Sequence, residues 1–231
     1  RRDEFSSHFR PLFSKWHLIE KEKDEKIIEQ IVKDGIHILM DLQGHSAKNR
    51  LPIFIYKPAP IQVSWLAQGS TGIPEIDYFI GSSHITPKNE ESHYVEKILR
   101  LPEISQCFTP PDFDVKVNNL PALINKFITF GSLNKLTKIS DEAIALWSKI
   151  LLSIPNSKLL LKSKEFDNQQ IIENTCKRFS KNKISKSRLI FKGELNTRKE
   201  LLEVYNEIDI ALDPFPFQGN TSTIEAVWMG V

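Results

Sequence analysis

The feature that most constrains the fold of this chain is a regular alternation between short apolar runs and longer amphipathic segments. Short apolar runs bounded by turn residues are typical of buried strands, whereas apolar residues repeated three and four positions apart are typical of helices. When strands and helices alternate through short connections, the strands lie parallel in one sheet and helices cover its faces. The alternation therefore predicts an α/β fold with doubly wound parallel sheets.

These expected elements form two series, separated by a proline-rich stretch near residues 102–121. The first series contains a helix over 24–33 and strands over 36–42, 61–66 and 77–80. The second contains strands over 128–133, 158–161, 189–191 and 208–212. Its helices are expected over 141–154, 168–179, 197–206 and 221–229, with Ser140 as the N-cap of the first. We therefore predict a first domain over 1–111, a linker over 112–127 and a second domain over 128–231.

Composition excludes several classes of protein. Net charge is +2, from 31 basic and 29 acidic residues, which does not favour a nucleic-acid binder. A lysine-rich stretch over 162–199 is interpreted as a solvated helix face or as a cluster facing an anionic ligand. It lacks the interleaved aromatic residues of single-strand binders. Two distant cysteines, Cys107 and Cys176, indicate neither a zinc site nor a disulfide scaffold, which favours the cytoplasm.

The two ends of the chain also carry information. No apolar run approaches the roughly 20 residues of a membrane-spanning helix, so no membrane association is expected. The chain starts on a charged stretch and finishes inside an expected helix at Val231. We therefore interpret it as a fragment of a longer protein in which both domains are incomplete.

Ligands of parallel α/β sheets bind at the carboxyl ends of the strands, so the loops after strands are the candidate sites. The loop over 43–50 contains Gly44, His45 and Ser46, which suit a polar or anionic ligand. A loop-capping histidine is the alternative interpretation of His45. Asp34 is nearby in sequence.

The loop over 134–140 places Lys135 and Lys138 just before a helix N-terminus. Cations are unfavourable there unless an anion binds, and a diphosphate would reverse the penalty. Two solvent-facing lysines are the alternative.

The loop over 213–225 carries the most specific local pattern. Gly219 and Asn220 precede three hydroxyl residues that open a helix, namely Thr221, Ser222 and Thr223. Backbone N–H groups and hydroxyls in this arrangement can bind phosphate without a Walker lysine. Glu225 could accept hydrogen bonds from ribose hydroxyls. Ordinary N-capping by Thr221 or Ser222 is the alternative.

Together these segments resemble the catalytic region of the O-linked N-acetylglucosamine (O-GlcNAc) transferase family, which includes the plant SPINDLY proteins and bacterial tetratricopeptide-repeat proteins. The matching segments keep the family's order: DGIHILMDLQGHSAKNRL (34–51), KPAPIQVSWL (57–66), STGIPEIDYFIG (70–81), LPEISQCFTPP (101–111), ITFGSLNKLTKIS (128–140), ALWSKILLSIPNSKLLLK (145–162) and DIALDPFPFQGNTSTIEAVWMGV (209–231).

The resemblance implies a GT-B glycosyltransferase fold, with two Rossmann-like domains facing across a cleft. It implies transfer of a sugar from UDP-GlcNAc, or from GDP-fucose as in the SPINDLY branch, to Ser or Thr hydroxyls by an inverting mechanism. The nucleotide sugar is a substrate, and no cofactor or metal ion is implied. A protein acceptor would be recruited by upstream tetratricopeptide repeats that this chain does not contain.

The resemblance also implies roles for individual residues. Lys138 matches the lysine that neutralises the leaving diphosphate, and Lys135 falls near the same phosphates, beside Asn134. The run Gly219-Asn220-Thr221-Ser222-Thr223 matches the phosphate-binding turn, although animal relatives have a histidine at the position of Asn220. Glu225 matches the acid that binds ribose, and Arg198 falls near a nucleobase-contacting lysine. His45 matches a loop that lines the cleft, and Asp34 matches an acid considered as the general base.

The sequence leaves three hypotheses for the function. The favoured one is a protein O-glycosyltransferase fragment that is inactive in isolation. A second is another GT-B transferase with a non-protein acceptor or a GDP-fucose donor. A third is a degenerate module that binds a nucleotide or a partner without catalysis.

Overall fold

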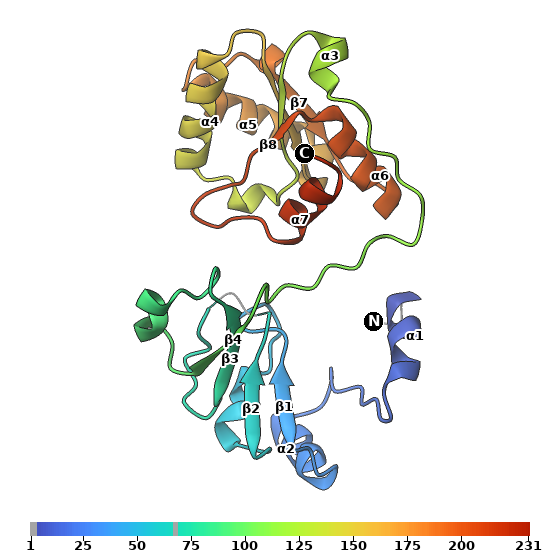
Figure 1. The fold of residues 1–231 in the computed structure, drawn as a ribbon, viewed down its shortest axis with the longest axis vertical. Helices are drawn as coiled ribbons and strands as arrows, with labels where there is room; N and C mark the ends of the chain where they lie inside the picture. Colours follow the sequence, from blue (N-terminus) through green and yellow to red (C-terminus); the bar gives the residue numbers. More distant parts are fainter. Residues whose placement is uncertain (1–3, 67–68) are drawn as a thin grey trace. The chain divides into compact units, whose positions relative to one another are not determined.

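The structure is a computed structural model that describes residues 4–66 and 69–231. The chain divides into two units, Arg1–Cys107 and Phe108–Val231 (Figure 1). Each unit is built on its own four-stranded parallel sheet. The predicted α/β class is thus present in both units, and each is described separately below.

The first unit has the strand order β1-β2-β3-β4. Its strands are β1 (Ile38–Asp41), β2 (Ile61–Ser64), β3 (Tyr78–Ser82) and β4 (Lys97–Leu101). Helix α1 (Glu4–Phe9) precedes α2 (Asp24–Lys33), and short 3-10 helices cover Arg10–Leu12, Leu51–Tyr56 and Lys88–His93. A small apolar core forms where α2 meets the 3-10 helix after β1, around Ile27, Leu51, Ile53, Phe54 and Ile76.

Two local differences from the predicted elements have simple causes. Strand β1 begins later than the predicted 36–42, because α2 ends at Lys33 with Asp34 as its C-cap and Gly35 then adopts a left-handed φ of +64°. Strand β4 was not predicted, because Lys97 and Arg100 interrupt its apolar pattern.

The second unit has the strand order β7-β6-β5-β8. Its strands are β5 (Thr129–Ser132), β6 (Lys158–Lys162), β7 (Leu189–Lys192) and β8 (Ile210–Ala211). Its helices are α3 (Pro121–Asn125), α4 (Asp141–Ser153), α5 (Gln169–Ser180), α6 (Arg198–Glu203) and α7 (Thr221–Trp228). Further 3-10 helices cover Leu136–Lys138, Lys164–Asp167, Lys186–Arg188 and Val204–Glu207.

Helices cover both faces of this second sheet. One core joins α4 and α5 to the face that carries Leu159 and Leu161 of β6. The other joins α6 and α7 to the opposite face, where Leu160 points. The two helix pairs lie on either side of the strands in Figure 1. This alternation along β6 is the doubly wound arrangement that the apolar pattern predicted.

Ser140 caps α4 as predicted, because its side chain accepts a hydrogen bond from the Ala143 amide. The helix expected over 197–206 is α-helical only to Glu203 and then continues as a 3-10 turn. The stretch expected to be a linker over 112–127 contains α3. Among the described residues, no helix combines the length and apolar character needed to cross a membrane.

Candidate functional site

The candidate site forms where β5 and β8 end side by side. These strands are paired in parallel, with Gly131 opposite Ala211, so the loops that follow them leave the same edge of the sheet. Asn134, which is buried, joins the two loops. Its side-chain amide donates to Asp213 Oδ1 at 3.4 Å and accepts a hydrogen bond from Ser222 Oγ at 3.1 Å. The structure therefore brings together two of the loops that the sequence singled out.

Lys138 lies on the loop after β5 and reaches the loop after β8. Its Nζ donates to the backbone oxygen of Gln218 at 2.9 Å and lies 4.6 Å from the centre of the Phe217 ring. Burial lowers the pKa of Lys138; the carboxylate of Asp213 opposes this shift, and the nearby charge of Lys135 adds to it. An anion bound at this point would favour the ammonium form. Lys135 itself is exposed.

The carboxylate of Asp213 organises the loop after β8. It accepts hydrogen bonds from the Gly219 amide at 2.7 Å and from Thr223 Oγ1 at 3.5 Å. A Cβ at Gly219 would lie 2.7 Å from oxygen atoms of Asp213, Ser222 and Thr223, so a larger residue here would force at least one of these side chains to move. A cavity of about 70 Å³ lies among the side chains of these loops. Sequence reasoning did not assign a role to Asp213; an acid directly after a strand that precedes a Gly-Asn turn was the available signal.

Helix α7 begins at this loop. Asn220 is the N-cap, and within the described chain its side chain makes no capping hydrogen bond. The alternative of N-capping by Thr221 or Ser222 is therefore wrong, because Ser222 directs its hydroxyl to Asn134 instead. Thr221 is exposed beside it. The first N–H groups of a helix have no intrahelical acceptor, so this end can bind an anion.

One turn further along α7, Glu225 is buried, and Arg198 from the start of α6 approaches it. Their charged groups lie 3.9 Å apart. Burial raises the pKa of Glu225, while the charges of Arg198 and Lys162 act in the opposite direction. The structure thus brings the predicted ribose-binding acid and the predicted nucleobase-side arginine to one place.

Tyr205 forms a hydrogen bond with the first turn of α7. Its buried hydroxyl donates to the backbone oxygen of Ser222 at 2.8 Å. Burial, with a smaller contribution from Glu225, raises the pKa of this phenol. The sequence did not single out Tyr205, because a tyrosine on an apolar helix face is normally interpreted as a core residue.

The two candidates in the first unit lie at opposite ends of β1. His45 follows its carboxyl end and is exposed, with Nε2 3.1 Å from the backbone oxygen of Ser70. Asp34 precedes its amino end, where it pairs with Lys15 at 2.5 Å and with His17 at 2.8 Å. The hydrogen bond from Lys15 is the main cause that lowers the pKa of Asp34 to about 2. The structure therefore does not bring Asp34 and His45 together, and the contact of His45 is with the loop after β2.

The described residues contain no group of His, Cys, Asp and Glu side chains arranged to hold a metal ion.

Comparison with known families decides the relationship of the chain. The family described as glycosyl transferase family 41 matches residues 17–109 and 107–231. The chain belongs to this family. The resemblance inferred from the sequence is thereby confirmed.

Plant SPINDLY proteins are similar in sequence to this chain over nearly its whole length. The probable UDP-N-acetylglucosamine–peptide N-acetylglucosaminyltransferase SPINDLY of Oryza sativa subsp. japonica is 37% identical over 210 residues, covering 90% of this chain and 23% of the relative. The SPINDLY protein of Arabidopsis thaliana is 35% identical over 217 residues, covering 94% of this chain and 24% of the relative. The chain thus spans about a quarter of the length of these relatives.

A solved structure of the same kind confirms the fold class. A mutant of the O-GlcNAc transferase from Thermobaculum terrenum matches with a TM-score of 0.91 and 34% identity, covering 100% of this chain and 44% of that protein. The two parallel α/β sheets are therefore those of a GT-B glycosyltransferase.

Proposed function

We propose that this chain is part of a protein O-glycosyltransferase that binds UDP-GlcNAc through its second unit and transfers GlcNAc to Ser or Thr hydroxyls. The observation that carries the proposal is the convergence of Lys138, the Gly219 turn and the start of α7 at one edge of the second sheet. The names of the SPINDLY relatives suggest the donor and the peptide acceptor. The cytoplasm, argued above from cysteine usage, is the proposed compartment.

The chemistry requires stabilisation of a leaving diphosphate. In an inverting transfer, the acceptor oxygen bonds to the anomeric carbon, the bond from that carbon to the diphosphate oxygen breaks, and the acceptor proton passes to a base. Negative charge then grows on UDP. The Lys138 ammonium and the free N–H groups of α7 are the donors that would meet this charge.

Other residues would hold the rest of the donor. Glu225 is one turn from the phosphate-binding end of α7, so its carboxylate suits the ribose hydroxyls. Arg198 lies beside Glu225 and suits the nucleobase side. Asn134, Lys135, Asn220, Thr221, Ser222 and Thr223 complete the proposed donor site. We propose His45 for the acceptor side in the first unit, whereas Asp34 is bound to Lys15 and His17 and is the weaker candidate for a base.

The test is calorimetric titration of the chain with UDP, GDP and UMP. We expect UDP to bind at least tenfold more tightly than either of the others, because both the diphosphate and the uridine contacts contribute. A preference for GDP would redirect the proposal to fucose transfer. No binding of any nucleotide would contradict the proposal and favour a partner-binding module.

A further inference from the structure

We propose that Ser140 is a positioning residue that fastens the loop after β8 to the start of α4, so that the two halves of the diphosphate site keep their relative positions. This inference rests on the proposed function for its ligand. Its structural content concerns only the loops over 134–140 and 213–220, which come from different strands of the second sheet.

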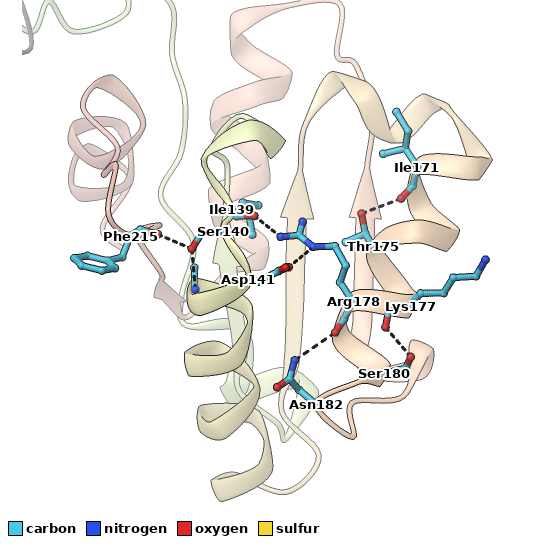
Figure 2. A network of polar contacts seen from close by, with 11 residues as sticks. Ile139, Ser140, Asp141, Ile171, Thr175, Lys177, Arg178, Ser180, Asn182 and Phe215 are labelled. Atoms are coloured by element: carbon cyan, nitrogen blue, oxygen red, sulfur yellow. Dashed lines mark hydrogen bonds and ion pairs between the residues drawn. The ribbon is translucent and has the colours of Figure 1, made fainter.

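The hydroxyl of Ser140 serves both elements at once. Its oxygen accepts a hydrogen bond from the Ala143 amide at 3.1 Å, which caps α4. Its proton goes to the backbone oxygen of Phe215 at 2.8 Å, in the middle of the loop after β8 (Figure 2). Helix capping needs only an acceptor. The donated bond to Phe215 is thus additional to the cap.

The start of α4 is a firm support for this bond. Arg178 of α5 donates from Nη2 to the backbone oxygen of Ile139 at 2.8 Å and from Nε to Asp141 Oδ1 at 2.7 Å. These two contacts hold the residues on either side of Ser140, as Figure 2 shows. Ile139 is buried in the core of the second unit. Ser140 is thus fixed to the body of the second unit before it reaches the loop.

The loop after β8 has little packing of its own. The side chain of Phe215 is 65% exposed and that of Phe217 is 44% exposed. A second tie is the bond from Lys138 Nζ to the Gln218 oxygen. A diphosphate that engages Lys138 competes with this carbonyl for the ammonium. The Ser140 bond does not involve a group that the ligand needs, so it holds the loop in both states.

A series at position 140 separates capping from positioning. Ser140→Thr keeps donor and acceptor. Ser140→Gly removes the hydroxyl, yet glycine is tolerated at an N-cap at a cost of a few tenths of a kcal/mol. Ser140→Ala removes the hydroxyl and is a poor cap. Ser153→Ala is the matched control, because the Ser153 hydroxyl donates to the Lys149 oxygen near the other end of the same helix.

We expect the dissociation constant for UDP to rise about fivefold in Ser140→Gly and Ser140→Ala, the factor typical of one lost hydrogen bond. Ser140→Thr and Ser153→Ala should change it by less than about twofold. The midpoint of thermal unfolding should fall further in Ser140→Ala than in Ser140→Gly, because alanine is the poorer N-cap. A fall in stability in Ser140→Ala together with unchanged UDP affinity in Ser140→Gly would show that Ser140 is a cap alone.

Amide hydrogen exchange measured without nucleotide tests the positioning role of Ser140 independently of the ligand. The amides of residue 215 and of 217–220 should exchange several-fold faster in Ser140→Gly than in the unsubstituted chain or in Ser153→Ala. If the unsubstituted chain binds no UDP but this exchange responds, the proposed function fails and the positioning role stands. If the exchange is unchanged in Ser140→Gly, the positioning role is overturned whatever UDP does.

Discussion

The carboxylate of Asp213 accepts a hydrogen bond from the Gly219 amide at 2.7 Å, and this bond closes the turn that leads into α7. The turn places the α7 N-terminus next to Lys138, whose ammonium contacts the Gln218 oxygen. A lysine, a glycine amide and a helix end from two separate loops thus converge on one point at the sheet edge. The proposed diphosphate site depends on this convergence.

Gly219→Ala should damage the turn. The added Cβ would lie 2.7 Å from oxygen atoms of Asp213, Ser222 and Thr223, so at least one contact must open. We expect UDP affinity to fall by tenfold or more in a calorimetric titration. Gly35→Ala is the control, because its φ of +64° makes that substitution strained in the other unit. It should lower the unfolding midpoint and leave UDP affinity unchanged; equal losses of affinity in both variants would contradict the account.

Tyr205→Phe should loosen the support of α7. The substitution removes the donor to the Ser222 oxygen and leaves that carbonyl without its partner. We expect a loss of about 1 kcal/mol in the free energy of unfolding by urea, the usual size for one hydrogen bond. Tyr56→Phe is the control, since Tyr56 is 70% exposed. Indistinguishable stability of the two variants would show that the Tyr205 hydroxyl does not hold α7.

Glu225→Gln should stabilise the chain at neutral pH while weakening nucleotide binding. Burial raises the pKa of Glu225 above its ordinary 4.5, so the folded state holds the proton more tightly than the unfolded state. This contribution to stability is present at low pH and is lost as pH rises through the folded-state pKa. Urea unfolding at pH 5 and pH 8 should show the advantage of the variant growing with pH. A variant that is less stable at pH 8 would mean that the ion pair with Arg198 outweighs burial.

Asp34→Asn should lower the stability of the chain at neutral pH, and this difference from the unsubstituted chain should disappear at low pH. Lys15 and His17 hold the pKa of Asp34 at about 2, below its ordinary 3.8. The stabilisation is therefore fully present above pH 3.8 and is lost as pH falls toward 2. The unfolding midpoints of variant and unsubstituted chain should converge over that range. Asp112→Asn, at an exposed position, should show no such convergence.

Local patterns along the sequence predicted most of the fold. Helix α2 appears at the predicted residues, and Ser140 caps α4 as expected. The spacing of apolar residues predicts these elements because each helix or strand must present an apolar face to the core. Strand β4 escaped prediction because its charged residues break the apolar run, and α3 escaped because prolines read as a break.

The candidate site was only partly predictable. The sequence pointed to Lys138, Gly219 and the hydroxyl run as candidates because their residue types are unusual after strands. Asp213 and Tyr205 were missed because their roles come from contacts across the fold, to Gly219 and to Ser222. Whether Asp34 could lie near His45 also depended on fold geometry, since β1 separates them.

The most direct test of the central claim compares Lys138→Ala with Lys149→Ala in a calorimetric titration with UDP. Lys138 lies in the site, while Lys149 is exposed on α4 nearby in the chain. Lys138→Ala should weaken UDP binding by about tenfold or more, the size expected for a charge-assisted contact to phosphate. Lys149→Ala should leave it within about twofold, as surface charges do. Equal effects of the two substitutions would show that the loop after β5 is merely surface and that the diphosphate binds elsewhere.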